Sequence, residues 1–413
     1  MRRRLSRELA RTQTFILAGG QGERLYPLTA SRPKPIVPLG GVFRIIDFTL
    51  SNCLHSEMSR VSVLTQYKYE EIHRYVREEW HELWSASGER APLACLAPVS
   101  GKRYRGTADA LFRNMELLHD DDSEFVFVLA GDHVYQMDYG DLLCQHVDTN
   151  ADLTIATIEY SLDRASQFGV VEIDETLKVT GFEEKPSKPR SMPSDPSRAL
   201  VSMGVYVFKK RILVESLRYF CENGIGYDFG HDIIPALIRE GRTFAFDFRD
   251  KADGEPHYWR DIGTIDAYHQ ANMDLLQPGA LFDSHLNRPT RYPLALTDWP
   301  EKTNFALIDR GVHVHRSVLS PGVELESGIV LEESVLMPGV RVGKGARLRR
   351  TIVEEGVAIP AGYHVGFDIE SDRREHAVTE NGIVVITHIP TSSKPKLLEF
   401  TTRRATARLS GTR

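Results

Sequence analysis

Short apolar runs alternate with helical patterns over the first two thirds of the chain. Three nearly continuous apolar runs, typical of strands buried on both faces, lie at residues 14–18, 60–65 and 125–130. Leu111, Met115 and Leu118 recur at intervals of three and four, which predicts a helix over residues 108–118. Alternating strands and helices predict an α/β domain with a mostly parallel sheet covered on both faces.

A different pattern, with a period of seventeen residues, follows nearer the C-terminus. Glycines repeat at this interval at positions 322, 339 and 356, and again at 328, 345 and 362. The triplets that begin at Ser317, Ser334 and Thr351 repeat in the same way. Each unit has three short faces turning at small residues, and such units bury their apolar side only by stacking. The repeat predicts a β-helix rather than chance alternation in a β-sandwich.

The remaining segments lack a periodic pattern and set the domain boundaries. We expect an N-terminal tail at 1–12, a proline-rich linker at 276–305 and a basic C-terminal tail at 391–413. The α/β domain then covers residues 13–275, and the repeat domain covers residues 306–390.

Composition excludes several classes of protein. No apolar run approaches the ~18 residues that a membrane span needs, and the basic N-terminus lacks the apolar core of a signal peptide. The net charge of −6 gives no case for nucleic-acid binding. The four cysteines lie more than forty residues apart, which favours free thiols over a zinc site or a disulfide framework. We expect a cytoplasmic protein.

The first candidate for chemistry is the glycine-rich turn Gly19-Gly-Gln-Gly22 between an apolar strand and a helix. Glycines at such a turn let backbone N–H groups converge on a phosphate. The turn is neither a Walker A loop nor a full dinucleotide fingerprint, since Leu25 stands where a third glycine is needed. Arg24 and Lys34 follow it and are suited to neutralising a polyphosphate. By itself, the motif is equally compatible with a plain tight turn.

Two acidic residues follow strand-like segments. Asp132 comes directly after the run at 125–130, and Asp261 follows an aromatic pair. Strand ends open into the ligand crevice of α/β sheets, where carboxylates are placed to hold Mg²⁺. Taken singly, Asp132 also suits a helix N-cap, and Asp261 suits a pair with a surface arginine.

Glu184 and Lys185 lie at the edge of a proline-rich loop. An ammonium suits a phosphate monoester, and a neighbouring carboxylate suits sugar hydroxyls. The alternative is a solvated charge cluster.

Together, these segments resemble the glucose-1-phosphate adenylyltransferases (ADP-glucose pyrophosphorylases) of glycogen and starch synthesis, from about residue 13 to 390. The resemblance rests on the strings Leu17–Leu25, Phe43–Phe48, Tyr104–Ala110, Leu129–His133, Glu183–Pro186 and Trp259–Gly263. The strings Phe-Arg-Ile-Ile-Asp-Phe and Tyr-Arg-Gly-Thr-Ala-Asp-Ala are specific to this branch of the sugar nucleotidyltransferases.

The resemblance implies a Rossmann-like nucleotidyltransferase domain followed by a left-handed parallel β-helix. It implies a Mg²⁺-dependent reaction of ATP with α-D-glucose 1-phosphate that yields ADP-glucose and pyrophosphate. The implied catalytic residues are Arg24, Lys34 and Asp132, and the implied Mg²⁺ ligands are Asp132 and Asp261. The nucleotide would contact Gly19, Gly20, Gly22, Gln66 and Gly106. Glucose 1-phosphate would contact Tyr104, Gly169, Glu184, Lys185 and Ser202.

The resemblance also implies a homotetramer controlled by an anionic allosteric effector, with Gln66 and Arg103 linking the substrate and effector sites. The chain departs from some bacterial relatives at Ser31 and Pro38, where they carry lysine and histidine. These departures argue against control by fructose 1,6-bisphosphate.

Three other functions compete with this prediction. A catalytically silent regulatory subunit is disfavoured because the whole catalytic set is present. An acyltransferase is disfavoured because no histidine recurs in the repeat as a general base. A sugar nucleotidyltransferase for another nucleotide or sugar phosphate remains open, because no single residue excludes UTP.

Overall fold

The computed structural model describes residues 2–86, 92–99, 102–118, 122–250, 254–276 and 311–389. These residues belong to two compact units, one ending at residue 276 and the other beginning at residue 311. The predicted C-terminal tail and all but the first residue of the predicted linker lie outside the described residues. No helix in the described ranges is long and apolar enough to cross a membrane.

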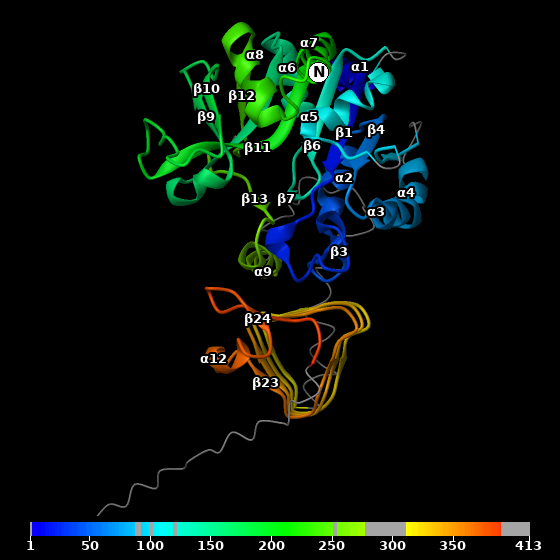
Figure 1. The fold of residues 1–413 in the computed structure, drawn as a ribbon, viewed down its shortest axis with the longest axis vertical. Helices are drawn as coiled ribbons and strands as arrows, with labels where there is room; N and C mark the ends of the chain where they lie inside the picture. Colours follow the sequence, from blue (N-terminus) through cyan, green and yellow to red (C-terminus); the bar gives the residue numbers. More distant parts are fainter. Residues whose placement is uncertain are drawn as a thin grey trace, which may run out of the picture. The chain divides into compact units, whose positions relative to one another are not determined.

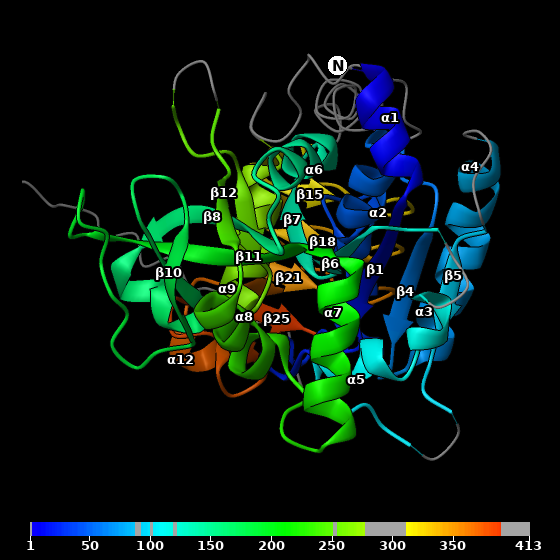
Figure 2. The ribbon, with the colours of Figure 1, turned by 90° about the horizontal axis from the view of Figure 1, so that it is seen from above.

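A nine-stranded sheet forms the centre of the first unit, and Figure 2 shows most of its strands side by side. The strands are β1 (Thr12–Ala18), β4 (Val61–Thr65), β5 (Ala94–Leu96), β6 (Phe125–Ala130), β8 (Leu153–Ser161), β9 (Gly169–Ile173), β10 (Val179–Glu184), β11 (Arg198–Lys209) and β12 (Thr243–Asp247). The main path runs β10-β9-β11-β6-β1-β4-β5, with β8 beside β11 and β12 beside β8. The three apolar runs are therefore confirmed as β1, β4 and β6.

The sheet is parallel in one half and mixed in the other. β5, β4, β1 and β6 are parallel, whereas β11 runs antiparallel to β6, β8 and β9. A parallel neighbour needs a long crossover connection. β9 and β10 instead follow each other through a short turn, so they pair antiparallel. The prediction of a mostly parallel sheet holds for the half that carries β1 and β6.

The two faces of the sheet bury two separate cores. Phe15 and Val126 contribute to one core, and their neighbours Ile16 and Phe127 contribute to the other. Residues of α2 (Ile45–His55) and α6 (Tyr139–Asp148) join the core of Ile16, and residues of α5 (Thr107–Phe112), α7 (Lys210–Leu217) and α8 (Ile234–Glu240) join the core of Phe15. The remaining elements of this unit are α3 (Tyr69–Tyr75), α4 (His81–Ala86), α9 (Ile265–Asp274), β2 (Pro38–Leu39), β3 (Phe43–Arg44), β7 (His133–Tyr135) and β13 (Trp259–Asp261). The prediction of a doubly covered sheet is confirmed.

The helix predicted over residues 108–118 is shorter than expected. α5 ends at Phe112, and Met115–Leu118 forms a separate 3₁₀ turn. The Asn114 side chain donates a hydrogen bond to the Ala110 carbonyl (2.8 Å), the group that the Asn114 backbone N–H would bind in a continuous helix. That N–H donates to Leu111 instead. Side-chain competition of this kind ends helices.

The predicted N-terminal tail is wrong. Residues Arg2–Ala10 form helix α1, and Thr12 already belongs to β1. Leu9 is buried, and Leu5 packs against the same core. Figure 1 shows α1 beside α6, where Arg4 forms an ion pair with Asp148 (2.9 Å). The two leucines lie one helical turn apart in the sequence, but a single pair among many arginines is a weak periodic signal.

The second unit is the predicted left-handed parallel β-helix, whose stacked coils have a triangular outline in Figure 1. One sheet contains β14 (His313–His315), β17 (Val330–Glu332), β20 (Arg347–Arg349) and β23 (His364–Val365). The second contains β15 (Val318–Leu319), β18 (Val335–Leu336), β21 (Thr351–Val353), β25 (Val384–Ile386) and β24 (Ala377–Val378), and the third contains β16 (Glu324–Leu325), β19 (Arg341–Val342) and β22 (Ala358–Ile359). A short helix, α12 (Ile369–Asp372), interrupts the last coil. His313 pairs with Val330, and Val330 with Arg347, so the period of seventeen residues is one coil.

Only two of the three corners turn at small residues. The six repeating glycines have φ between 68° and 75° and form two of the corners. The third corner has φ of 44–47° at charged residues, namely Arg316, Glu333 and Arg350. Each is followed by a hydroxyl residue whose side chain donates to the carbonyl two residues earlier, as Ser334 does to Glu332 (2.8 Å). These local hydrogen bonds stabilise a turn that a small residue was expected to make.

Replacing Leu348 by alanine is expected to cost about 2–5 kcal/mol of unfolding free energy, because the side chain is fully buried between the sheets of the β-helix. Urea unfolding of the full chain measures the loss. Glu324→Ala on an exposed position of the same unit is the control, and we expect it to stay within about 0.5 kcal/mol of the parent. Equal losses in both variants would contradict a close-packed coil interior.

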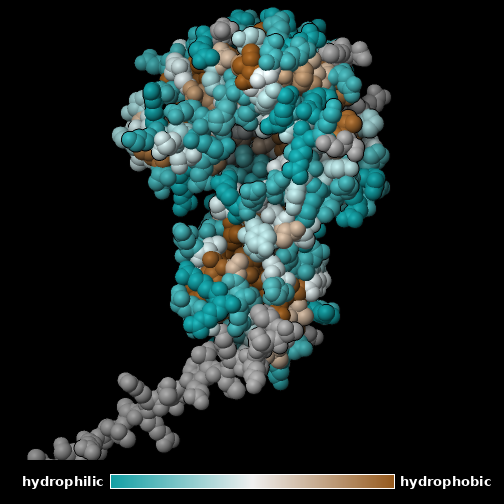
Figure 3. Space-filling view, in the orientation of Figure 1, coloured by the Kyte–Doolittle hydropathy of each residue, from teal (hydrophilic) through white to brown (hydrophobic). Residues whose placement is uncertain are grey.

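The surface of the first unit is mostly hydrophilic on the face drawn in Figure 3, with hydrophobic residues scattered singly. Isolated apolar residues of this kind are normal on soluble domains.

Candidate active site

The glycine-rich turn lies at the carboxyl end of β1. Gly22 has φ of 69°, and a Cβ there would lie 2.8 Å from the Lys34 Cβ, so a side chain at this position would be strained. Gly20 is exposed, and no atom lies within 4 Å of the place where its Cβ would be. The backbone at Gly20 is therefore open to an approaching phosphate, as the sequence predicts for a phosphate-binding turn.

Asp132 and Asp261 are brought together by strand pairing. Asp132 follows β6, and the next residue, His133, begins β7. β13 pairs antiparallel with β7, and Asp261 lies opposite His133 in this register. Ligand atoms of these three residues all lie within 4.8 Å of one another, which makes them the cluster of metal-ligand side chains found among the described residues.

Lys34 joins the two carboxylates. Its Nζ lies 2.8 Å from Asp132 Oδ2 and 3.1 Å from Asp261 Oδ1, and only 8% of its side chain is exposed. Burial by itself lowers the pKa of Lys34, but the two carboxylates outweigh it and the pKa is raised. Burial likewise raises the pKa of Asp132, but Lys34 and His133 outweigh it and the pKa is lowered. Lys34 and Asp132 are therefore both charged at neutral pH.

Arg24 approaches this cluster from the glycine turn. Its Nη2 lies 4.0 Å from Asp261 Oδ2, and more than half of its side chain is exposed. Its Nη1 donates to the Gln167 side chain at 3.5 Å. Arg24 thus combines one contact with the carboxylate cluster and a guanidinium that solvent or a ligand can reach.

A second polar cluster lies on β9, β10 and β11. Glu184 is held so close to Gly169 that a Cβ there would lie 2.9 Å from its Oε2. Lys185 Nζ donates to Glu184 Oε1 (2.7 Å) and its side chain is more than half exposed. The buried Ser202 hydroxyl lies 3.1 Å from the Tyr206 hydroxyl. Burial raises the pKa of Tyr206, and the nearby charge of Glu184 adds to this. Gly169, Glu184 and Ser202 therefore lie on three adjoining strands, and Lys185 directly follows one of them.

The other predicted residues lie around the segment that leads into α5. Gln66, which follows β4, accepts a hydrogen bond from the Tyr104 backbone N–H. The Tyr104 hydroxyl accepts one from Asn114 (3.0 Å). Gly106 lies against the backbone carbonyl of Tyr227, where a Cβ would approach the oxygen to 2.4 Å. Packing alone therefore accounts for this glycine.

Arg103 is exposed. Among the described residues, no hydrogen bond or ion pair links the Arg103 side chain to a predicted site residue, so its assignment to regulation stays a prediction.

The sequence analysis gave no role to His133 or Asp228. His133 Nδ1 bonds to the Met203 carbonyl (3.0 Å), and its Nε2 lies 3.7 Å from Asp132 and 3.6 Å from Asp261. Asp228 accepts hydrogen bonds from Thr107 (3.0 Å) and from the Gly230 N–H (2.9 Å), which places it beside the second polar cluster. His133 belongs to a string that carries the family resemblance, but only the folded contacts single out either residue.

Comparison with known proteins agrees with this architecture. The family model "Nucleotidyl transferase" matches residues 13–278, and "GlmU-like, C-terminal hexapeptide" matches residues 306–386. A glucose-1-phosphate adenylyltransferase of Methylobacillus flagellatus is 41% identical over 91% of this chain and 93% of its own length. Proteins named glucose-1-phosphate adenylyltransferase 2 from Alkalilimnicola ehrlichii and Vibrio vulnificus are 39% and 44% identical over 93% and 90% of this chain, and over 95% and 97% of their own lengths. The chain therefore belongs to the nucleotidyl transferases and, among them, to the glucose-1-phosphate adenylyltransferase family.

Proposed function

We propose that this protein joins ATP and α-D-glucose 1-phosphate into ADP-glucose, releasing pyrophosphate, as a step in glycogen (α-glucan) synthesis. The observation that carries the proposal is the cluster of Lys34, Asp132 and Asp261 at the carboxyl ends of β1 and β6, beside an open glycine turn. The names of its relatives point to the same reaction.

In this reaction a phosphate oxygen of glucose 1-phosphate attacks the α-phosphorus of ATP. The bond from that phosphorus to the bridging oxygen breaks, and the electron pair leaves with pyrophosphate. The attacking oxygen is already anionic at neutral pH, so the enzyme needs no strong general base. It must instead align two polyanions against their repulsion.

The cationic side chains are placed for this task. Lys34 and Arg24 lie at the glycine turn, where the triphosphate would bind. Lys185 belongs to the second polar cluster, where the sugar phosphate would bind. Glu184 offers a carboxylate to sugar hydroxyls, and Ser202 offers a hydroxyl. Neutralising charge and orienting both substrates is the main protein contribution in phosphoryl-group chemistry.

We further propose that Asp132 and Asp261 hold Mg²⁺. Two carboxylates close together are a donor set that Mg²⁺ takes, and these two come from the β6–β7 connection and from β13. A bound Mg²⁺ would neutralise the charge that develops on the phosphate oxygens. Lys34 would serve the same carboxylates as counter-ion before the cation arrives.

Control by an anionic effector, assembly into a homotetramer and a cytoplasmic location complete the proposal. The Gln66 bond to the Tyr104 backbone ties the loop after β4 to the segment that carries Arg103, which supports a regulatory link. The end coils of the β-helix present strand edges that proteins usually cover or pair. None of the four cysteines, which all lie in described residues, forms a disulfide, and this suits a reducing compartment.

The test is pyrophosphate release with Mg²⁺ and glucose 1-phosphate, with ATP, UTP, dTTP and GTP offered separately. We expect release with ATP alone, and none without the sugar phosphate or with chelator. A preference for another nucleotide would keep the transferase reaction and overturn the choice of ATP. A folded protein that is silent with all four would favour a regulatory subunit.

A further inference from the structure

A cavity of about 680 Å³ lies at the end of the sheet opposite to Asp132. It is lined by Glu124 and Phe125 at the start of β6, whereas Asp132 follows the end of that strand. At about 3.3 Å per residue, the cavity and Asp132 lie roughly 20 Å apart along β6. The cavity is therefore separate from both polar clusters of the candidate active site.

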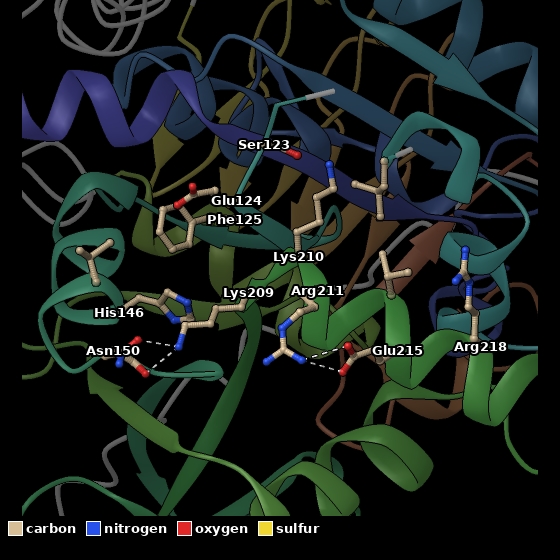
Figure 4. A pocket seen from close by; sticks show the side chains of 13 residues that line it. Ser123, Glu124, Phe125, His146, Asn150, Lys209, Lys210, Arg211, Glu215 and Arg218 are labelled. Carbon is tan, nitrogen blue, oxygen red and sulfur yellow. Dashed lines mark hydrogen bonds and ion pairs between the residues drawn. The ribbon is translucent and has the colours of Figure 1, made fainter. Parts of the chain in front are cut away.

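One wall of the cavity is a face of α7 and the turn that continues it. The wall residues recur at the spacing of one helical face and are Lys210, Arg211, Val214, Glu215 and Arg218. Figure 4 shows these side chains and those of β6 and α6 around the same space. The volume lies within the range of small-molecule sites.

Cations outnumber carboxylates in the lining. The cationic residues are Lys209, Lys210, Arg211 and Arg218, whereas the acidic residues are Glu124 and Glu215. Arg211 binds Glu215 through Nη1 alone, at 3.0 and 3.2 Å, and the guanidinium carries further N–H donors on Nη2 and Nε. Both side chains of this pair are more than half exposed, so solvent weakens it. An anion in the cavity can therefore bind Nη2 and Nε of Arg211 while Nη1 keeps its hydrogen bonds to Glu215.

A buried histidine, His146, is among the residues around the cavity. His146 is fully buried, and its Nδ1 lies 2.8 Å from the Thr154 hydroxyl. Its Nε2 has no hydrogen-bond partner among the described residues. Burial and the charge of Lys209 lower the pKa of His146 to about 3, so the ring is neutral at physiological pH. Nε2 has almost no exposed area, so His146 lies behind the lining and does not contact a ligand in the cavity.

The remaining lining combines Ser123 and Asn150 with four apolar residues. Leu118 and Phe125 are buried, whereas Val147 and Val214 are partly exposed and offer hydrocarbon surface next to the cationic wall. A bare inorganic anion would leave this surface against water, whereas an anion with a compact apolar body would cover it.

We propose that this cavity binds a small organic anion, whose phosphate or carboxylate group meets Arg211 and its cationic neighbours while its apolar body covers Val147 and Val214. The site lies outside the machinery of the proposed reaction and adds a ligand to it.

Isothermal titration of the full chain with phenyl phosphate, benzoate and inorganic phosphate tests the proposal. Saturating glucose 1-phosphate is present throughout, to occupy the other phosphate-binding positions. We expect phenyl phosphate or benzoate to bind about tenfold or more tightly than inorganic phosphate, because only they bury apolar surface. The better of the two identifies the preferred anionic group.

Two variants locate the binding. Arg211→Gln is expected to weaken it about tenfold, because a charged hydrogen bond is lost, and Val214→Trp is expected to abolish it by filling the cavity. Arg373→Gln, which removes an exposed arginine paired with Glu370 in the other unit, should leave it unchanged. Pyrophosphate release should persist in all three variants, which shows that they are folded and separates this result from the proposed reaction.

Three results would overturn the proposal. They are no detectable binding of phenyl phosphate or benzoate, equal binding of inorganic phosphate, or binding that survives both Arg211→Gln and Val214→Trp.

Discussion

Asparagine in place of Asp132 is expected to lower kcat for pyrophosphate release by about a hundredfold or more, which is the usual loss when one electrostatic stabiliser of a transition state is removed. The change keeps the shape of the side chain and removes one of the two charges that would hold Mg²⁺. The remaining activity should need more Mg²⁺, because Asp261 alone binds the cation more weakly. Initial rates at several Mg²⁺ concentrations measure both effects.

Asp148→Asn is the matched control for this change. Asp148 is an exposed aspartate on α6 that pairs with Arg4, away from the carboxylate cluster. We expect its kinetics to equal those of the parent. Near-full activity of Asp132→Asn would rule out the role of Asp132 as a metal ligand.

Methionine in place of Lys34 is expected to destabilise the metal-free protein by about 3–5 kcal/mol, the usual cost of leaving buried charges without their partner. Methionine has a similar length and no charge, so Asp132 and Asp261 would face each other without the ammonium that lies between them. Mg²⁺ should recover part of the loss, because a cation that binds only the folded state stabilises it. Urea unfolding in chelator and in excess Mg²⁺ measures the two values.

The destabilisation by Lys34→Met should also depend on pH. The pKa of Asp132 is lowered in the folded protein, so its ion pair contributes stability above the ordinary pKa of 3.8 and loses it as the pH falls further. The difference between parent and variant is therefore expected at pH 7 and should shrink in acid. Lys178→Met, on an exposed lysine, is the control. Equal stability of Lys34→Met and its parent in chelator would refute the counter-ion role.

The sequence predicts the buried architecture well, for a physical reason. Strands covered on both faces must be apolar throughout, so β1, β4 and β6 are visible as runs. A coil that repeats every seventeen residues must repeat its corners, so the β-helix is visible as well. Helix α1 could not be predicted, because the role of Leu5 and Leu9 becomes visible only when they pack against the core.

The candidate site is less accessible to sequence reasoning. Lys34 is separated from Asp132 by 98 residues and from Asp261 by 227. No local sequence pattern indicates that these three residues meet. Their roles could therefore be predicted only from the family resemblance. The contacts of His133 depend on the pairing of β13 with β7, a register that a sequence does not display. Burial of His146 without a second partner is likewise a property of the fold alone.

The β-helix also has a consequence for protein engineering. The chain leaves the coil after β23, forms α12 and β24, and returns so that Thr351 of β21 pairs with Val384 of β25. The stack therefore resumes its register after an excursion that contains its own helix and strand. The segment between β23 and β25 is a suitable place to graft a foreign loop or an affinity tag, because the coils on either side need no redesign.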